Sequence, residues 1–164
     1  MTESKYIWMD GEFVNWHDAK VHVLSHTLHY GNGAIEGTKA YKTVDGRCAI
    51  FKLNEHTQRL LNSSKMTLMN VPFTLEELNK AQIELLQKNE LFDGAYIRPL
   101  VYLGYGVMGL YHKEAPVKVS VSAWEWGAYL GEEGLRKGVR VKISSFTRTP
   151  NTSGMGKAKA VANY

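Results

Sequence analysis

The amino-acid sequence predicts an α+β fold, with an antiparallel sheet and two helices packed on it. Two Asp-Gly pairs lie between segments of β-forming residues, and two later segments alternate between apolar and polar residues. Two stretches with helix signals stand between these two groups of strands. Hairpin strands with helices grouped between them, instead of a strict strand–helix alternation, are typical of α+β domains.

The two Asp-Gly pairs predict two β-hairpins. Asp-Gly supplies the positive φ angles that a tight turn between twisted strands requires. The residues on both sides of each pair favour extended structure. The expected arms are 6–9 and 12–15 around Asp10-Gly11, and 38–44 and 47–51 around Asp45-Gly46. Two such hairpins indicate an antiparallel sheet.

Local capping signals predict the two helices. Asn54 is expected to be the N-cap of a helix that ends near Met66, because asparagine side chains accept hydrogen bonds from the first turn. Thr74 and Glu77 match the capping-box pattern T-x-x-E, which opens a second, amphipathic helix that ends near Asn89.

Two further strands follow the helices. Residues 95–103 form the first, and Pro99 within it indicates an edge strand or a bulge, because proline cannot donate to a ladder. Tyr96 and Arg98 lie on one face of this strand, since side chains repeat every second residue. They could form a carboxylate clamp or a surface pair. Residues 117–124 alternate regularly and predict a half-buried strand.

The glycine-rich stretch after the last of these strands indicates a connection between two domains. We expect a small α+β domain over residues 1–128, an interdomain linker over 129–134 and the start of a larger domain over 135–164. Alternating apolar residues over 139–143 predict a new strand in that second domain.

Composition places the chain among globular proteins. Of its 164 residues, 44% are apolar and 22% are charged. No segment approaches the ~18 consecutive apolar residues of a membrane span, and the N-terminus lacks the apolar core of a secretory signal. Cys48 is the only cysteine, so no intrachain disulfide can form. We expect a cytoplasmic protein with no membrane partner.

The net charge of +4 is unevenly distributed. Residues 134–164 contain basic side chains and no acidic one, which suits an anionic small ligand. The basic residues are dispersed and no nucleic-acid-binding motif accompanies them, so we expect no nucleic-acid partner. No metal site is expected either.

Three features allow both a structural and a functional interpretation. Lys159 is near the end of the sequence, where most lysines are solvated, although a lysine can attack an aldehyde as its neutral amine. Arg59 is either a solvated helix residue or an anion ligand. The glycine-rich segment 25–39 is either a plain loop or the lining of a pocket into which Tyr30 points.

Seven stretches, in order along the chain, resemble the branched-chain amino acid aminotransferases of the fold-type IV family, which uses pyridoxal 5'-phosphate (PLP). They are Y-I-W-M-D-G-E near the start, A-K-V-H-V-L-S-H-T-L-H-Y-G at 19–31, E-G-T-K-A-Y at 36–41, H-T-Q-R-L at 56–60, A-Y-I-R-P-L at 95–100, W-G-A-Y-L-G at 126–131 and K-A-V-A-N-Y at 159–164. Any one stretch is weak evidence, whereas seven in order at similar spacing are specific.

The resemblance implies how the cofactor is held. Lys159 matches the lysine that forms the Schiff base with PLP and later moves a proton. Tyr164 matches the tyrosine that hydrogen-bonds the phenolic oxygen of the cofactor. Arg59 matches the arginine that holds its phosphate.

The resemblance also implies a substrate site. Tyr96 matches a tyrosine that binds the substrate α-carboxylate, and Trp126 matches an apolar wall of the side-chain pocket. Arg98, Tyr30 and Tyr129 match the set that accepts the distal carboxylate of glutamate. Tyr30 would serve the site of the neighbouring subunit, which implies a homodimer.

The implied reaction transfers an amino group between Leu, Ile or Val and 2-oxoglutarate, as in branched-chain amino acid biosynthesis. The family usually has Phe where this chain has Ile35 and commonly has Arg where it has Lys39, which leaves the substrate preference open. Family enzymes are longer and their large domain follows the lysine. We therefore expect an N-terminal portion that is inactive alone.

Two alternatives stay open. The same fold could carry a D-amino acid aminotransferase or an aminodeoxychorismate lyase, although W-G-A-Y-L-G and A-Y-I-R favour the branched-chain group. The chain could also be a non-catalytic module that self-associates through apolar surfaces.

Overall fold

The computed structural model describes residues 2–127, 130–147, 150, 152 and 154–164. Its centre is a seven-stranded antiparallel sheet in the order β2-β1-β7-β6-β4-β5, with β3 also paired to β6. The strands are β1 (Tyr6–Met9), β2 (Glu12–Asn15), β3 (Gly33–Ile35), β4 (Thr38–Lys42), β5 (Cys48–Ile50), β6 (Ala95–Leu103) and β7 (Val117–Glu125). The helices are α1 (His26–Tyr30), α2 (Leu53–Met66), α3 (Leu75–Lys88) and α4 (Gly131–Lys137), with 3-10 turns η1 (Trp16–Asp18) and η2 (Val161–Asn163).

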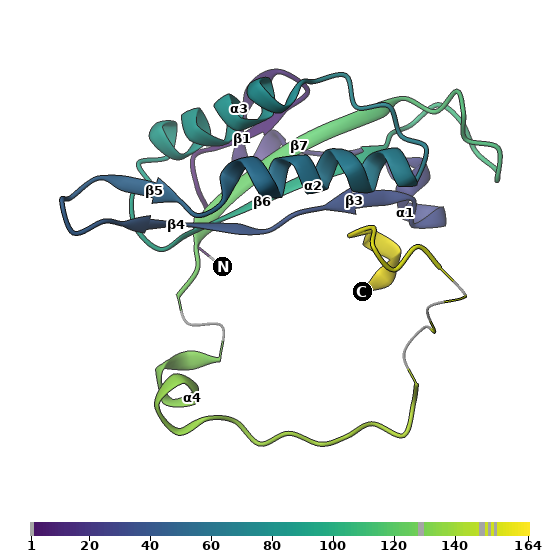
Figure 1. Cartoon of the computed structure of the whole chain (residues 1–164). Helices are drawn as coiled ribbons and strands as arrows, with labels where there is room; N and C mark the ends of the chain where they lie inside the picture. Colours follow the sequence, from purple (N-terminus) through teal and green to yellow (C-terminus); the bar gives the residue numbers. More distant parts are fainter. Residues whose placement is uncertain (1, 128–129, 148–149, 151, 153) are drawn as a thin grey trace.

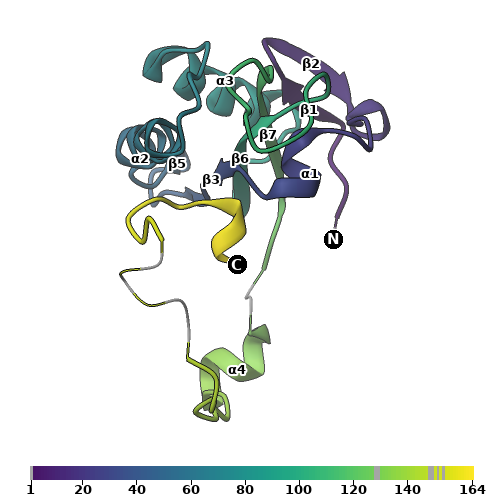
Figure 2. The same ribbon diagram turned by 90° about the vertical axis from the view of Figure 1, so that its right-hand side faces the viewer.

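Two helices cover one face of the sheet, as predicted. Figures 1 and 2 show α2 and α3 on the same side of the strands. The side chains of β6 and β7 alternate, so Ile97, Val101 and Val119 are fully buried under these helices. Leu60 of α2 and Leu85 of α3 are fully buried on the helix side of this core. Among the described residues, no long helix covers the opposite face of the sheet, which is called the open face below.

Both predicted hairpins are present. β1 pairs with β2 around Asp10 and Gly11, which have φ angles of 50° and 105°. β4 pairs with β5, but this connection is longer than the two-residue turn expected. The backbone N–H of Thr43 donates to the carbonyl of Arg47, and only Gly46 in this turn has a positive φ.

One of the two helix starts differs from the prediction. Thr74 caps α3 with the complete capping box, as its pattern predicts. The prediction that Asn54 caps α2 is wrong, because the helix begins at Leu53 and its N-cap is Lys52 in the left-handed region. The Asn54 side chain instead accepts a hydrogen bond of 2.6 Å from Asn79 of α3. A tertiary contact between the helices therefore replaces the local cap.

Pro99 lies in an interior strand, so the prediction of an edge strand or bulge is wrong. β6 pairs with β7 along its whole length. On its other side it pairs with β3 as far as Ile35 and with β4 from Thr38. Proline has no N–H to donate, and the partner strand is interrupted opposite it, at Glu36 and Gly37. The break between β3 and β4 therefore lies opposite the one residue of β6 that cannot donate a backbone hydrogen bond.

The region after β7 has less regular structure than predicted. α4 overlaps the expected linker, and the strand expected over 139–143 is absent from the described residues. Val139, Val141 and Ile143 are exposed instead. A strand requires a hydrogen-bonded partner, and none of the described strands pairs with this segment. The domain boundaries at 128 and 134 stay predictions.

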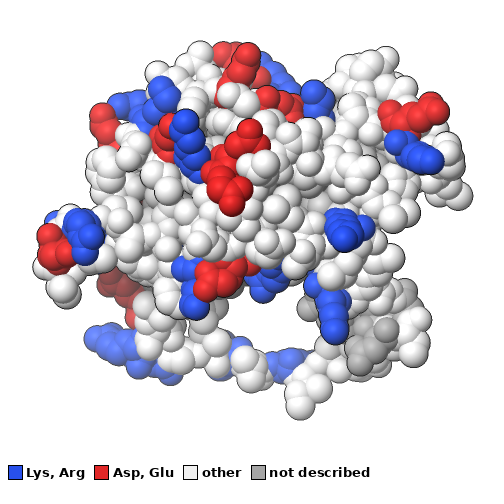
Figure 3. All heavy atoms as spheres, turned by 45° about the horizontal axis from the view of Figure 1, so that its top comes forward, with Lys and Arg blue, Asp and Glu red and all other residues white. Residues whose placement is uncertain are grey.

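The surface carries charges of both signs. Figure 3 shows acidic and basic side chains interspersed on the face that it displays. Among the described residues, no three or more His, Cys, Asp or Glu side chains gather in a way that could hold a metal ion. In the same part of the chain, no helix is long and apolar enough to cross a membrane.

Candidate active site

The C-terminal segment lies along the free edge of β3, as Figures 1 and 2 show. The backbone N–H of Ile35 donates to the carbonyl of Lys159 at 3.0 Å, and Ala34 forms an antiparallel bridge with Ala160. The N–H of Lys159 donates to the Ser63 hydroxyl of α2, also at 3.0 Å. Lys159 is thus held from both sides, by a strand and by a helix, although its side chain is only half-buried.

The glycine-rich segment 25–39 is not the loop that was predicted, because it contains α1, β3 and the start of β4. Its glycines make the docking of the C-terminal segment possible. A Cβ atom on Gly31 would lie 3.1 Å from the Ala162 side chain. A Cβ on Gly33 would lie 3.0 Å from Val161 and 3.1 Å from the carbonyl of Val101. These distances are tighter than ordinary contacts, so glycine is required for close approach. The glycine-rich segment therefore provides the surface on which the segment that carries Lys159 packs.

Lys159 and Tyr164 form a pair at this edge. The Lys159 ammonium donates to the Tyr164 hydroxyl at 2.6 Å and lies 4.6 Å from the centre of its ring. The segment between them turns back through η2, where the Asn163 side chain donates to the carbonyl of Ala158. An amine and a phenol in this contact can share or exchange a proton.

Arg59 lies on α2 and binds a buried acid. Its Nε and Nη2 donate to the two carboxylate oxygens of Glu36, the Nη2 bond being 2.8 Å long. Nδ1 of His56 lies 2.9 Å from the same carboxylate and can donate to it. Burial raises the pKa of Glu36, but the hydrogen bonds from Arg59 and His56 outweigh it and hold this pKa below its ordinary value.

The guanidinium of Arg59 also interacts electrostatically with Tyr164 of the Lys159–Tyr164 pair. Its hydrogen bonds to Glu36 raise its pKa, and interaction with Tyr164 adds to this rise. About half of the Arg59 side chain is exposed, at 52%. The predicted cofactor residues Lys159, Tyr164 and Arg59 are therefore brought together around β3 and α2.

An aromatic and cationic cluster occupies the open face of the sheet. Arg98 donates to the Tyr96 hydroxyl from Nε at 3.2 Å and from Nη2 at 2.9 Å, which confirms that the two share a face. The Tyr96 ring contacts the rings of Trp124 and Trp126 at centroid distances of 5.1 and 4.6 Å. Gly37 makes room for this arrangement, since a Cβ there would lie 2.0 Å from the Tyr96 hydroxyl oxygen.

Ile35 pairs with Leu100, which lies on the same face of β6 as Tyr96 and Arg98. Ile35 therefore shares this open face. Tyr30 does not join them. It lies in α1 near the other end of β6, where its hydroxyl accepts from the N–H of Gly109 at 3.1 Å. At the usual rise per residue, the two ends of this strand are roughly 26 Å apart.

The remaining predicted residue, Tyr129, lies outside the described residues.

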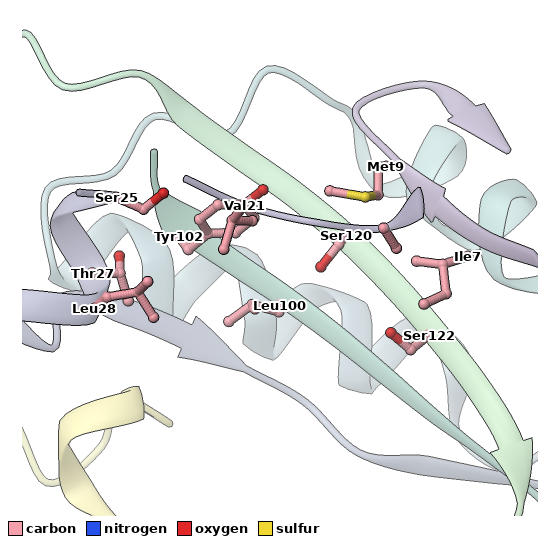
Figure 4. Close-up of a pocket in the computed structure, with 11 residues that line it drawn as sticks. Ile7, Met9, Val21, Ser25, Thr27, Leu28, Leu100, Tyr102, Ser120 and Ser122 are labelled. Carbon is pink, nitrogen blue, oxygen red and sulfur yellow. The ribbon is translucent and has the colours of Figure 1, made fainter. Parts of the chain in front are cut away.

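A separate apolar groove lies on the open face (Figure 4). Its walls come from β1, β6, β7, α1 and the segment before α1, and it contains none of the predicted site residues. The lining residues are Ile7, Met9, Ala19, Val21, Ser25, Thr27, Leu28, Leu100, Tyr102, Ser120 and Ser122. This groove is therefore distinct from the edge that holds Lys159.

Sequence reasoning missed the residues that hold the site in place. Glu36, Gly37 and Ser63 contact the guanidinium, the Tyr96 ring and the Lys159 backbone, respectively. One signal was available for Glu36: it stands beside a glycine in a stretch that resembles the family. The burial of Glu36 could not be predicted from the sequence, because it depends on the packing of α2 over the break between β3 and β4.

Comparison with known proteins shows the family of the chain. Residues 33–164 match the family described as Amino-transferase class IV. The chain therefore belongs to the class IV aminotransferases. Within that family, the curated relatives it matches carry the name branched-chain-amino-acid aminotransferase, which confirms the resemblance seen in the sequence.

Two relatives illustrate the extent of the likeness. The Pseudomonas aeruginosa protein is 47% identical over 158 residues, which cover 96% of this chain and 51% of the relative. The Escherichia coli protein is 43% identical over 168 residues, which cover 100% of this chain and 53% of the relative. The chain thus spans about half the length of the curated relatives that it matches.

Solved structures confirm the fold. The Escherichia coli branched-chain amino acid aminotransferase superposes with a TM-score of 0.91 at 39% identity, covering 98% of this chain and 53% of the other. The T.th. branched-chain amino acid aminotransferase, solved with pyridoxamine 5'-phosphate, gives 0.91 at 45% identity, covering 99% and 53%. The α+β fold with its antiparallel sheet and two covering helices is therefore that of known aminotransferases.

The residues at the β3 edge fit a PLP-type cofactor. PLP presents an aldehyde, a phenolic oxygen and a phosphate, which an amine, a phenol and a guanidinium complement in turn. Lys159, Tyr164 and Arg59 supply these groups from one neighbourhood. The crowding of Gly31 and Gly33 against residues 161–162 gives that neighbourhood a defined backbone shape.

Proposed function

We propose that this chain belongs to an enzyme that transfers the amino group between branched-chain L-amino acids and 2-oxoglutarate with PLP. The enzyme would act in the cytoplasm, in branched-chain amino acid biosynthesis. The likeness to named branched-chain aminotransferases over nearly the whole chain supports this proposal.

The observation that carries the proposal is the Lys159–Tyr164 pair on the edge of β3. The backbone of Lys159 is fixed by Ile35 and Ser63, so its amine is presented from a defined position. The 2.6 Å contact with Tyr164 lets the two groups hold one proton between them. A lysine that must bond covalently to a cofactor and then move a proton needs both properties.

The cofactor supplies the electron sink that transamination requires when it is bound. This chain would supply three functions around it. Lys159 holds or moves the proton, Tyr164 donates to the phenolic oxygen, and Arg59 binds the phosphate.

The cluster on the open face would receive the substrate. Tyr96 would bind the α-carboxylate, and Arg98 would bind the distal carboxylate of glutamate. Trp126 and Ile35 would line the apolar side-chain pocket. Tyrosine and tryptophan are amphipathic, so this surface can accept both leucine and glutamate in turn. Tyr129 is assigned to the same site by resemblance alone.

Tyr30 supports a homodimer. It is exposed at 42% and lies far along β6 from Tyr96, so it would serve the site of a second subunit. Neighbouring apolar residues of the same segment, Val23 and Leu28, are 70% and 62% exposed. Light scattering should give at least a dimer, whereas a strict monomer at high concentration would contradict this assignment.

A half-reaction tests the function directly. The whole enzyme to which this chain belongs is loaded with PLP, one amino acid is added, and conversion to the pyridoxamine form is followed by absorbance. We expect conversion with L-leucine, L-isoleucine, L-valine and L-glutamate, and none with D-alanine. Conversion with D-alanine alone would favour a D-amino acid aminotransferase.

Arg98→Leu provides the matched variant for this experiment. It removes the guanidinium and leaves a shorter, apolar side chain. We expect it to lower the rate with L-glutamate at least about tenfold, the scale of one lost charge-assisted hydrogen bond, and to spare L-leucine. Equal losses with both amino acids would contradict the role of Arg98.

A further inference from the structure

Glu36 is a carboxylate with no exposed surface in the middle of the predicted site. It lies at the break between β3 and β4 and receives hydrogen bonds from Arg59, from His56 at 2.9 Å and from the N–H of Gly37 at 3.3 Å. A buried charge is costly unless it is paired and hydrogen-bonded. Such a residue is retained only where its partners need it.

One face of α2 connects Glu36 to Lys159. His56, Arg59 and Ser63 are three and four residues apart, so they project from the same side of the helix. The first two bind Glu36, and the third binds the N–H of Lys159. Ile35, directly before Glu36, binds the carbonyl of Lys159. The acid therefore joins the strand and the helix that together hold the lysine.

The geometry of the ion pair leaves part of Arg59 available. A guanidinium has five N–H donors in a planar fork. The carboxylate of Glu36 accepts hydrogen bonds from the edge of the guanidinium formed by Nε and Nη2. Within the described part of the chain, no hydrogen bond uses Nη1. The other edge can thus meet a second anion while the first stays engaged, as the fork geometry allows.

We propose that Glu36 is the positioning residue of the anion site: it holds Arg59 with its second edge turned toward the phosphate of the cofactor. The inference rests on the proposed function, in which Arg59 binds that phosphate. Glu36 itself touches no cofactor atom. It acts by fixing the orientation of the guanidinium, which would otherwise be a mobile, half-exposed side chain.

Affinity for PLP relative to pyridoxal tests the proposal, because only PLP carries the phosphate. The main variant is Glu36→Asp, which keeps the negative charge but is one methylene too short for the same fork. We expect the ratio of the two affinities to fall about tenfold, as when one charge-assisted hydrogen bond is lost. Affinity for pyridoxal itself should be unchanged.

Three further variants complete the design. Glu36→Gln removes the charge and should lower the same ratio, because the amide nitrogen that replaces one carboxylate oxygen is a donor and cannot accept from the guanidinium. Arg59→Ala should abolish the preference for PLP, and Glu36→Asp should have no added effect in its presence. Glu55→Gln is the matched control, since Glu55 is an exposed glutamate on the same helix that pairs with Lys52.

Each outcome decides between explanations. If Arg59→Ala lowers the preference and Glu36→Asp does not, Arg59 binds phosphate without help and the inference is wrong. If Glu36→Gln raises the preference while Glu36→Asp leaves it unchanged, Glu36 acts only through its charge, which also contradicts positioning. If the whole enzyme with Glu36 and Arg59 unchanged shows no preference for PLP, Arg59 does not bind the phosphate, and this part of the proposed function fails together with the inference.

A measurement on the unchanged chain covers the case in which the variants do not fold. The Nε–H signal of Arg59 is followed by nitrogen-15 NMR while PLP is added. Positioning by Glu36 requires that this proton stay protected from solvent exchange in the bound state. Loss of protection on binding would mean that Arg59 leaves Glu36 to reach the phosphate, and would overturn the inference.

Discussion

Single residues around β3 carry more of the site than the sequence alone indicates. Arg59 was predicted to face either solvent or an anion, and its immediate partner proves to be the buried carboxylate of Glu36. A propensity argument assigns glutamate to the surface, so it cannot identify a glutamate with no exposed surface. The pairing of Tyr96 with Arg98 was predictable, because it follows from strand periodicity alone.

The Glu36 ion pair predicts a dependence of stability on pH. The pKa of Glu36 is lower in the folded chain than its ordinary value of 4.5, so the pair stabilises the fold above that pH. This stabilisation is lost as the pH falls through the folded-state pKa. Urea unfolding from about pH 6 to about pH 3 should therefore show the stability difference between the unchanged chain and Glu36→Gln shrinking with acidification.

The exposed glutamate at the end of β7 provides the control for general charge. Glu125→Gln should give a curve parallel to that of the unchanged chain. A difference between the chain and Glu36→Gln that stays constant over the whole range would show that Glu36 contributes no pH-dependent stability.

Gly37 predicts a steric effect on the substrate cluster. Gly37→Ala would place a methyl group 2.0 Å from the Tyr96 hydroxyl oxygen, so the ring must move. Overpacking of this kind costs about 1–3 kcal/mol. We expect a matching loss in the free energy of unfolding and a change in the fluorescence of Trp126, whose ring contacts Tyr96.

Gly127→Ala is the matched control for this prediction. A Cβ on Gly127 has nothing within 4 Å, so neither stability nor fluorescence should change appreciably. If Gly37→Ala behaved like this control, the close packing of Tyr96 on the backbone would be excluded.

At the scale of helices and strands, features that depend on neighbouring residues could be predicted from the sequence. Features that depend on tertiary contacts could not. The capping box of Thr74 and the Asp10-Gly11 turn depend on a few neighbouring residues, and both are present. The structural roles of Asn54 and Pro99 depend on contacts with residues that are distant in the sequence. The first contacts Asn79, and the second is tolerated in an interior strand because its partner strand breaks opposite it.

The docking of the C-terminal segment on α2 predicts a local change in hydrogen exchange. Ser63→Ala removes the hydroxyl that accepts from the N–H of Lys159. Loss of one hydrogen bond worth about 1–1.5 kcal/mol should speed exchange of that amide about tenfold. Exchange in the paired strands β6 and β7 should be unaffected.

Ser64→Ala is the control from the next position of the helix. Ser64 is also buried, but its hydroxyl donates to the carbonyl of Leu60 within α2. It should leave the exchange of the Lys159 amide unchanged. Equal acceleration in both variants would attribute the effect to loosening of the helix and not to the contact.

At the scale of the whole molecule, the proposed site draws on segments that are distant in the sequence. Residues 33–39, 56–63, 96–98 and 159–164 contribute to it, and the family match extends from 33 to 164. Their arrangement was predictable only through the resemblance, because no local rule brings Lys159 to the edge of β3. The likeness to solved aminotransferases, at a TM-score of 0.91, confirms the fold that this arrangement needs.

The most direct test of this account is the site of covalent attachment of PLP. The chain is incubated with PLP, reduced with borohydride and mapped by peptide mass spectrometry, with Lys157→Ala as the control and Lys159→Ala as the test variant. We predict a label on Lys159 that persists in the control and disappears in the test variant. A label scattered over surface lysines, unchanged in Lys159→Ala, would contradict the claim that the β3 edge forms the cofactor site.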